Sequence, residues 1–292
     1  MAEVTKAIIP IAGLATRFLP LSKVVSKELW PVVDLPLFQY IIEEAKNSGI
    51  KEIIFVTRPK EKILFNYLTP SPQLEKALKE KKKNDILGDL QRTEDLFKSI
   101  TFSSVVQKRA LGDGHAILQA ARLINDEPVA VLFVDDIVDS KTPCLAQLTK
   151  VFKTCQKPVV ALYRLPKERI PFYGVVKVER IASRLYKIKQ VVEKPSADKA
   201  PSDLAVVGKY ILTPEVFQYL KKAEPNERGE IIIADTLQKM NQEGKLCYGY
   251  EFEGKWLECG NKMEWLKTNA CLALKHPQYG PELRKYLKEI IK

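Results

Sequence analysis

The stretch KAIIPIAGLATRFLPLSKVVSKELWP, residues 6–31, joins an apolar run to a turn of small residues and then to closely spaced cations. The run AIIPI at 7–11 is typical of a buried strand, and AGLA at 12–15 leaves the backbone almost free of bulky side chains. Backbone N–H groups in such a loop can approach phosphate oxygens. Arg17 and Lys27 follow within reach of the loop. This order predicts a polyphosphate site after the first strand.

The loop alone also fits a tight turn between a strand and a helix. It has neither the GK[ST] of a Walker loop nor a GxGxxG dinucleotide pattern. Ala15 stands where a phosphate loop would be expected to have glycine. The cations decide between these interpretations, because a planar guanidinium and a flexible ammonium can bind two different phosphates.

Composition limits the class of protein. The 292 residues are 46% hydrophobic and 28% charged, as in ordinary globular domains. No apolar run approaches the roughly 20 residues of a membrane span, and the N-terminus does not resemble a secretory signal. Five cysteines form no CxxC pair, which favours reduced thiols over a disulfide framework. We therefore expect a cytoplasmic protein with no membrane partner.

The net charge of +11 raises the question of nucleic acid as a partner. The basic residues are spread along the chain, and the densest run, KALKEKKKND at 76–85, is interrupted by acids. No basic patch is interleaved with aromatic residues that would stack on bases. Small anionic substrates explain the charge better, and we expect no nucleic acid partner.

Apolar runs alternate with segments of helical periodicity. This alternation predicts an α/β fold with a Rossmann-like, mostly parallel mixed sheet and helices on both faces. Ligands of such sheets bind beyond the carboxyl ends of the strands, where the loop at 12–15 would lie. The expected strands are 6–12, 51–57, 102–107, 129–134 and 158–164, and the expected helices are 34–49, 115–124 and 143–155.

Two segments depart from this alternation. Residues from about 60 to 100 are highly charged and predict a helical excursion, whereas YGVVKVE, YKIKQVVE and AVVGKYIL, from 173 onward, predict an antiparallel addition. We expect one composite α/β domain over 1–260, with a ligand-binding part at about 165–235. A helical tail, interrupted between Pro277 and Pro281, would follow over 261–292.

Several side chains could do chemistry at this edge of the sheet. Asp135 and Asp136 follow an apolar strand, where carboxylates hold Mg²⁺ in nucleotide enzymes, although a turn or helix-capping role also fits. Glu193 and Lys194 end another strand and could bind hydroxyl and phosphate groups, or form an exposed ion pair. His115 follows two glycines at an expected helix start, where capping or structural contacts are favoured over general acid catalysis.

Together these motifs resemble the bacterial-type UTP–glucose-1-phosphate uridylyltransferases, from about residue 5 to 275. IPIAGLATRFLP is similar to the family pattern IPAAGLGTRxLP, and SKELWPVVDLPLFQYIIEEA is similar to PKEMLPxxDKPxIQYxxEE. QKRALGDGHAI, VAVLFVDDI, YGVV, VVEKPSADKAPSDLAVVGKYIL, GEIIIADTL and CGNK follow in family order. The resemblance implies that UTP and glucose 1-phosphate give UDP-glucose and pyrophosphate, with Mg²⁺ as cofactor, in a homodimer or higher homo-oligomer.

The resemblance implies that the domain over 1–260 is of the nucleotidyltransferase type and that its part at about 165–235 binds the sugar. It also implies roles for single residues. Arg17, Lys27, Asp135 and Lys194 would be catalytic, and Asp135 and Glu258 would hold the metal. The loop Ala12-Gly13 with Gln107 and Gly112 would bind the base, and Arg17 and Lys27 the pyrophosphate side. Asp136, Gly174, Glu193, Lys194 and Gly208 would form the sugar site.

The chain departs from the family pattern at four uncharged positions, at one carboxylate and at one arginine. The changed positions are Ala15, Arg58, Val134, Ile232, Ala234 and Glu258, while Arg17, Lys27, Asp135, Glu193 and Lys194 are retained. Two alternatives therefore remain open. The enzyme could prefer another nucleotide or sugar phosphate, or the chain could be a weakly active regulatory protein that binds UDP-sugars.

Overall fold

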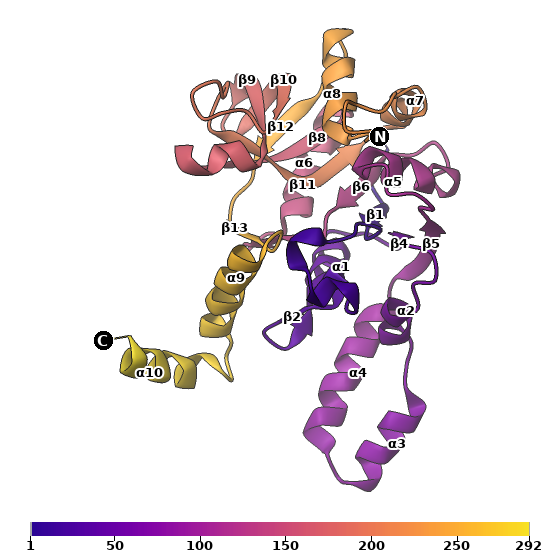
Figure 1. The fold of residues 1–292 in the computed structure, drawn as a ribbon. Coiled ribbons are helices and arrows are strands. Elements are labelled where there is room, and N and C mark those ends of the chain that lie inside the picture. The colour runs from indigo at the N-terminus through magenta and orange to yellow at the C-terminus, as the bar shows by residue number, and fades with distance from the viewer. Residues whose placement is uncertain (1, 292) are drawn as a thin grey trace.

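A computed structural model describes residues 2–291 and is built around one nine-stranded mixed sheet (Figure 1). The strand order is β5-β4-β1-β6-β11-β8-β12-β10-β9. In chain order the strands are β1 (Lys6–Pro10), β4 (Glu52–Thr57), β5 (Thr101–Val106), β6 (Val129–Leu132), β8 (Val159–Arg164), β9 (Gly174–Ala182), β10 (Leu185–Glu193), β11 (Leu204–Leu212) and β12 (Tyr248–Glu251).

The first half of the sheet is parallel, as the sequence predicts. β1 lies between β4 and β6, with Ala7 opposite both Ile53 and Ala130. Its alternate side chains enter two separate cores, Ile9 on one face and Ile8 on the other. Burial on both faces explains why these strands are continuous apolar runs.

β11 gives the sheet its mixed character. The three strands predicted after residue 173, β9, β10 and β11, pair antiparallel with one another or with β6 and β8, as expected. However, β11 lies in the middle of the sheet between β6 and β8, not at an edge. Lys209 on this strand is 0% exposed, and its Nζ lies 2.7 Å from Glu44 Oε2 of helix α1. A buried charge needs such a partner, so this ion pair lets a lysine occupy a central strand.

Helices cover both faces of the sheet and extend away from it at two places. Figure 1 shows α3 and α4 projecting as a pair, and α9 and α10 leaving the body near the C-terminus. These are the excursion and the tail that the sequence predicts. The helices are α1 (Leu37–Asn47), α2 (Ile63–Leu68), α3 (Pro72–Glu80), α4 (Asn84–Lys98), α5 (Asp113–Gln119), α6 (Cys144–Cys155), α7 (Pro214–Lys221), α8 (Ile233–Gln242), α9 (Lys262–Lys275) and α10 (Gly280–Ile290).

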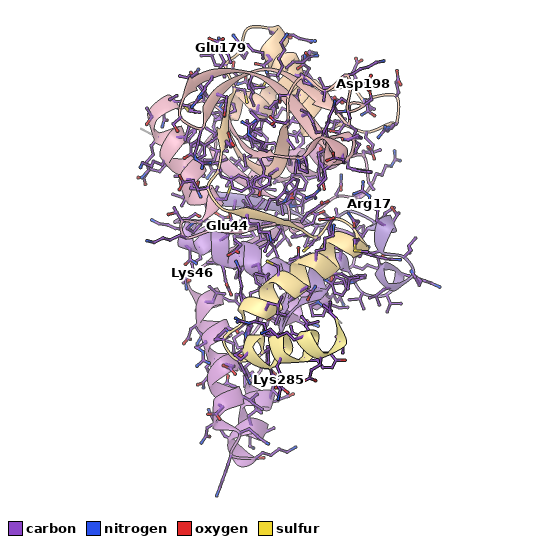
Figure 2. All side chains as sticks on the ribbon, turned by 90° about the vertical axis from the view of Figure 1, so that its left-hand side faces the viewer. Arg17, Glu44, Lys46, Glu179, Asp198 and Lys285 are labelled. Carbon is purple, nitrogen blue, oxygen red and sulfur yellow. The ribbon has the colours of Figure 1, made fainter. Side chains whose placement is uncertain are left out.

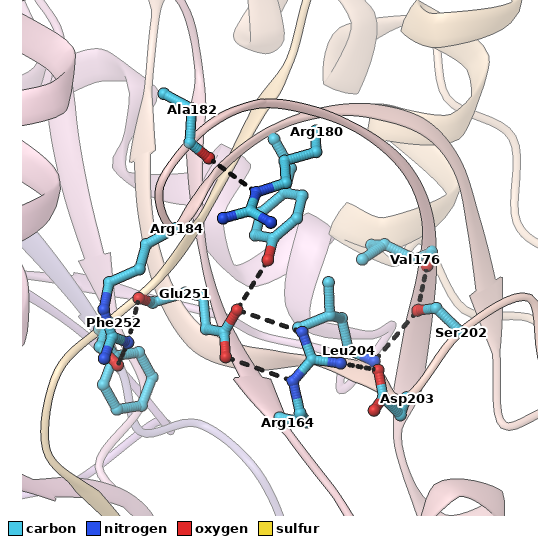
Figure 3. A network of polar contacts seen from close by, with 11 residues as sticks. Arg164, Val176, Arg180, Ala182, Arg184, Ser202, Asp203, Leu204, Glu251 and Phe252 are labelled. Atoms are coloured by element: carbon cyan, nitrogen blue, oxygen red, sulfur yellow. Dashed lines mark hydrogen bonds and ion pairs between the residues drawn. The ribbon is translucent and has the colours of Figure 1, made fainter.

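A polar network joins the strands of the second half of the sheet (Figure 3). Arg164 at the end of β8 pairs with Asp203, just before β11, and its Nη2 lies 3.3 Å from Glu251 Oε2 of β12. Tyr186 of β10 also donates to Glu251 at 2.8 Å. The network connects β8, β10, β11 and β12 at a distance from the cavities described below. We attribute to it a structural role.

Two short strands bring the C-terminal part of the chain back to the parallel half. β7 (Asp136–Asp139) pairs with β13 (Lys255–Glu258), and Glu258 lies opposite Asp136 in their register. The Cys259 amide also donates to the Asp135 carbonyl at 2.7 Å. Within residues 2–291, no helix combines the length and apolarity that a membrane crossing requires.

Candidate functional site

A cavity of about 440 Å³ opens beyond the carboxyl end of β1. The loop after β1, the segment after β5 and the segment after β6 form its walls, because the ends of these neighbouring parallel strands meet at one edge. Five predicted nucleotide-site residues line it, and so does the predicted metal ligand Asp135. The predicted lining residues are Ala12, Gly13, Lys27, Gln107, Gly112 and Asp135.

Ala15 adopts the left-handed conformation in this loop, with φ 49° and ψ 44°. An alanine there is disfavoured relative to glycine by roughly 1 kcal/mol, because its Cβ crowds the following carbonyl. The departure at this position therefore has a conformational cost. The short 3₁₀ helix Thr16–Phe18 follows, with Arg17 exposed on its outer side, as Figure 2 shows.

Gly112 forms the opposite wall and cannot be replaced without strain. Its φ is 97°, and a Cβ built on it would overlap the carbonyl oxygen of Ile231. The segment before α5 thereby passes close to the start of α8, where the Ile233 amide donates to Asp113 Oδ1 at 2.9 Å. This packing holds the wall of the cavity in place.

Lys27 and Asp135 form an ion pair inside this cavity. Lys27 Nζ lies 2.8 Å from Asp135 Oδ2, and their side chains are 20% and 25% exposed. Burial opposes the ionisation of Asp135, but Lys27 holds the pKa of this carboxyl below its ordinary value. Burial likewise opposes the charge of Lys27, but Asp135 raises the lysine pKa. Asp135 lies in the turn between β6 and β7, and its side chain pairs with Lys27 and caps none of the described helices.

A second cavity, of about 780 Å³, lies on the other side of Asp135. Asp113 and Asp135 line both cavities, so the two spaces meet there. Arg17 lines this second cavity and not the first, unlike the other predicted nucleotide residues. The predicted residues on its walls are Arg17, Asp135, Asp136, Gly174, Glu193, Lys194 and Glu258.

Asp136 is fixed by donors from two strands. Trp256 Nε1 donates to its Oδ1 at 2.7 Å, and the Gly208 amide donates to Oδ2 at 3.0 Å. Burial, together with the neighbouring Asp135, raises the pKa of Asp136 to about 7. A Cβ on Gly208 would overlap Asp136 Oδ2 and lie 2.7 Å from Phe133. Gly208 thus shapes this cavity indirectly, by making room for Asp136.

Glu258 is held by side chains that the sequence did not single out. Arg169 Nη2 lies 3.0 Å from Glu258 Oε2, and the Tyr173 hydroxyl donates to the same oxygen. Burial nevertheless raises the pKa of Glu258. Arg169 and Tyr173 also line the second cavity. Tyr173 directly precedes Gly174 in the motif YGVV, which is the one sequence signal that could have indicated it.

The two predicted metal ligands face a common space. A Cβ placed on Gly260 would lie 2.8 Å from Glu258 Oε1 and 3.3 Å from Asp135 Oδ2. Among the described residues, three or more carboxylate, imidazole or thiolate side chains do not gather into a metal cluster. Two carboxylates suit Mg²⁺, which binds one or two of them and completes its shell with water and substrate phosphates. The donor set fits that ion.

Glu193 and Lys194 form the ion pair considered in the sequence analysis, and they also lie in the cavity. Lys194 Nζ is 2.8 Å from Glu193 Oε1, and Lys194 has φ 46°. Glu193 lies opposite Gly174 in the register of β9 and β10. The two sequence interpretations are therefore compatible, since an exposed pair on the cavity wall can open to a ligand.

The uncharged departures from the family pattern lie at the walls. Ile232 and Ala234, at the start of α8, line the second cavity, and buried Val134 lines the first. Arg58 lies apart from both cavities and donates to Ser26 Oγ at 2.6 Å. Ala15 lines the first cavity too, so the retained charged residues and four of the substituted uncharged ones belong to the same walls.

Known proteins match this chain over nearly its whole length. A family model described as nucleotidyl transferase matches residues 6–273. A UTP–glucose-1-phosphate uridylyltransferase of Staphylococcus haemolyticus is 40% identical over 290 residues, which is 99% of each chain.

Two solved structures extend the match to the fold. A UDP-glucose pyrophosphorylase complexed with UDP-glucose has 36% identity and a TM-score of 0.83, covering 94% of this chain and 100% of its own. A UTP-bound UGPase from Acinetobacter baumannii has 32% identity and a TM-score of 0.89, covering 98% of this chain and 99% of its own. The family match at 6–273 includes every residue that lines the two cavities.

Proposed function

This chain belongs to the nucleotidyl transferase family, and from that premise we propose that it makes UDP-glucose and pyrophosphate from UTP and glucose 1-phosphate. The observation that carries the proposal is the junction of two cavities at Asp135. One cavity is lined by the small-residue loop after β1 and by Lys27, as suits a nucleotide, and the other is lined by several charged and polar side chains, as suits a sugar phosphate. A transfer between two bound substrates needs this adjacency.

In the first cavity, we assign the loop Ala12-Gly13 with Gln107 and Gly112 to the nucleotide base. Lys27 and Arg17 would bind the β- and γ-phosphates, which leave as pyrophosphate. Their positions support this assignment, because Lys27 lines the first cavity and Arg17 lines the second, so that the two cations can contact different phosphates of one nucleotide. Cations there would stabilise the charge that develops on the leaving group.

In the second cavity, we assign Lys194 to the phosphate of glucose 1-phosphate. Glu193 and Asp136 would accept hydrogen bonds from sugar hydroxyls. Gly174 leaves space for the ring, and Gly208 makes room for Asp136. Lys194 would exchange its contact with Glu193 for the incoming phosphate. The sugar phosphate oxygen would then attack the α-phosphorus in line, and the bond to the β-phosphate would break.

Enzymes of this family generally use a divalent metal, and we propose Mg²⁺. Asp135 and Glu258 would hold it, as their convergence beside Gly260 supports. When bound, this ion would neutralise the phosphates and polarise the α-phosphoryl group. Arg169 and Tyr173 orient Glu258 toward the same space.

We further propose a reducing, cytoplasmic location and a homo-oligomer. All five cysteines are free, which suits a compartment that keeps thiols reduced. The C-terminal helical segment, 261–292 by our domain division, exposes Met263, Leu266, Tyr286 and Ile290, and such apolar residues favour a subunit contact. Analytical ultracentrifugation would measure the association, and a monomer at micromolar concentration would contradict it.

The test of the reaction is pyrophosphate release by the purified chain with UTP, glucose 1-phosphate and Mg²⁺. Parallel reactions contain dTTP, galactose 1-phosphate or no metal. Metal-dependent release with UTP and glucose 1-phosphate supports the proposal. Faster release with another pair would show a different specificity, and binding of UDP-glucose without any release would indicate a regulatory protein.

A further inference from the structure

Gln107 lies at the end of β5 with its side chain enclosed at the wall of the nucleotide cavity. It is 5% exposed. Its Nε2 donates to the Gly112 carbonyl oxygen at 3.0 Å and lies 2.8 Å from His115 Nδ1. Both partners come from the segment that begins α5. The side chain therefore bridges the end of one strand and the first turn of the following helix.

The Gly112 carbonyl fixes the orientation of the Gln107 amide. A carbonyl oxygen can only accept a hydrogen bond, so the NH₂ end of the amide must face it. One amide hydrogen goes to Gly112, and the other points at His115 Nδ1. This ring nitrogen must then accept, and the proton of a neutral imidazole must be on Nε2.

Other groups around His115 bear on this assignment. Gln119 Nε2 lies 3.2 Å from His115 Nε2. If this amide donated to Nε2, the ring proton would be on Nδ1, which is the opposite tautomer. Its contact is longer, and Gln119 borders an open cavity of about 510 Å³ in which it can turn. Lys108, Arg109 and Arg122 line that cavity too, and cations disfavour a second proton on the ring. Burial also lowers the pKa of His115.

With both amide hydrogens engaged, Gln107 Oε1 is the remaining hydrogen-bonding atom of this side chain. Within residues 2–291, no donor is bonded to it. Because Gln107 Oε1 can only accept a hydrogen bond, a base bound in this cavity would have to donate one to it from a ring N–H. Uracil and thymine carry a hydrogen on N3, whereas cytosine presents a lone pair at that position.

We propose that His115 is a positioning residue that locks the Gln107 amide, so that Oε1 selects a base with a ring N–H donor and rejects cytosine. The inference rests on the proposed function, because it requires a pyrimidine nucleotide in this cavity. This role gives a reason for the position of His115, which does not line the nucleotide cavity but contacts Gln107, which does.

Two variants separate hydrogen bonding from packing. His115→Asn places its amide oxygen where Nδ1 lies and keeps the acceptor, whereas His115→Leu keeps bulk and removes it. Calorimetric titration with UTP and with CTP measures affinity without turnover. We expect the preference for UTP over CTP to fall at least about 10-fold in His115→Leu and to remain within about 3-fold of the parent in His115→Asn.

An unchanged preference in folded His115→Leu would overturn the proposal, and so would equal losses in both variants.

A measurement on the unaltered protein tests the proposal even if the variants do not fold. The chain has two histidines, His115 and His276, so ¹⁵N spectra of the ring nitrogens can be assigned with a His276→Gln variant. A proton on Nε2 of His115 supports the proposal, and a proton on Nδ1 overturns it. Selective UTP binding without pyrophosphate release would contradict only the proposed reaction.

Discussion

Lys27 Nζ lies 2.8 Å from Asp135 Oδ2 at the place where the two cavities meet. In the free protein, the cation proposed for phosphate and the carboxylate proposed for the metal neutralise each other. A nucleotide that arrives with its metal brings both opposite charges at once. Each side chain can then exchange its partner without either charge being left uncompensated.

Replacement of Asp135 by asparagine removes one charge of this pair. We expect kcat to fall at least about 100-fold, because a metal ligand and a charge at the transferring phosphate are lost. The thermal midpoint should fall by about 4 °C or less, since both side chains keep access to water. Pyrophosphate release and calorimetry measure the two effects. Asp139→Asn, on the same short strand, is the matched control and should keep normal turnover.

Lys194→Ala should act on the sugar phosphate. We expect the KM for glucose 1-phosphate to rise about 10-fold or more, because a charge-assisted contact is lost, while the KM for UTP changes little. Steady-state kinetics with each substrate varied gives the comparison. Lys189→Ala is the control, as Lys189 is on β10, the strand that Lys194 directly follows, and pairs with Glu179 outside the cavities. An equal rise in both KM values would argue against the assignment.

Ala15→Gly should stabilise the protein. Glycine relieves the left-handed strain at φ 49°, although it adds freedom to the unfolded chain. The net gain should be about 0.5–1 kcal/mol, seen as a rise of about 2 °C in the thermal midpoint. Leu14→Gly in the same loop, whose φ is not positive, should lower the midpoint instead. If both variants lowered it, the strain at Ala15 would be refuted.

Gly208→Ala should damage the second cavity. The added methyl group would overlap Asp136 Oδ2 and crowd Phe133, so we expect a loss of about 1–3 kcal/mol in the free energy of unfolding. Chemical denaturation measures this change. Gly88→Ala in helix α4 adds the same group without a clash and should stabilise by roughly 0.5–1 kcal/mol. Similar effects of the two substitutions would contradict the close approach at Gly208.

Glu28 offers a test by pH. It is 3% exposed with no partner for its Oε1, and burial raises its pKa to about 7 against the opposing effect of Arg58. The folded state therefore binds a proton more tightly than the unfolded state, and the free energy of unfolding falls as pH rises from about 4.5 to 7. The decrease in the free energy of unfolding over this pH range should reach roughly 1–3 kcal/mol.

Glu28→Gln removes this titration and should be more stable than the parent above pH 7. Denaturation curves of both proteins between pH 5 and 8 give the difference directly. Glu80→Gln, on the exposed helix α3, controls for the added amide. A difference that does not change with pH would show that Glu28 is already ionised in the folded protein at the lower end of this range.

The sequence predicts the parallel strands and the charged residues of the site for the same reason. Strands such as β1 are buried on both faces and so are continuously apolar, and the loops that follow them must carry the polar groups. Arg17, Lys27 and Asp135 could be found in this way, and the structure gathers them around the two joined cavities.

Other features depend on distant contacts that local patterns do not encode. The central place of β11 requires Lys209 to meet Glu44, far away in the chain. Arg169 and Tyr173 act on Glu258 from the short 3₁₀ helix Lys167–Phe172 and the residue after it, which no periodicity marks in the sequence. The pairing of Lys27 with Asp135 is not predictable from the sequence either, because the two residues are 108 positions apart and each alone is typical of a ligand-binding residue.

The late arrival of β11 also affects how a new chain folds during its synthesis. β6 ends at Leu132, but its neighbour β11 begins at Leu204. At about 5–20 residues per second, a ribosome needs on the order of ten seconds to make the intervening and pairing residues. Throughout that interval, the edge of β6 is an unpaired apolar strand, and such edges recruit other chains. A nascent chain of this protein is therefore most exposed to aggregation, and most in need of a chaperone, between the synthesis of its two half-sheets.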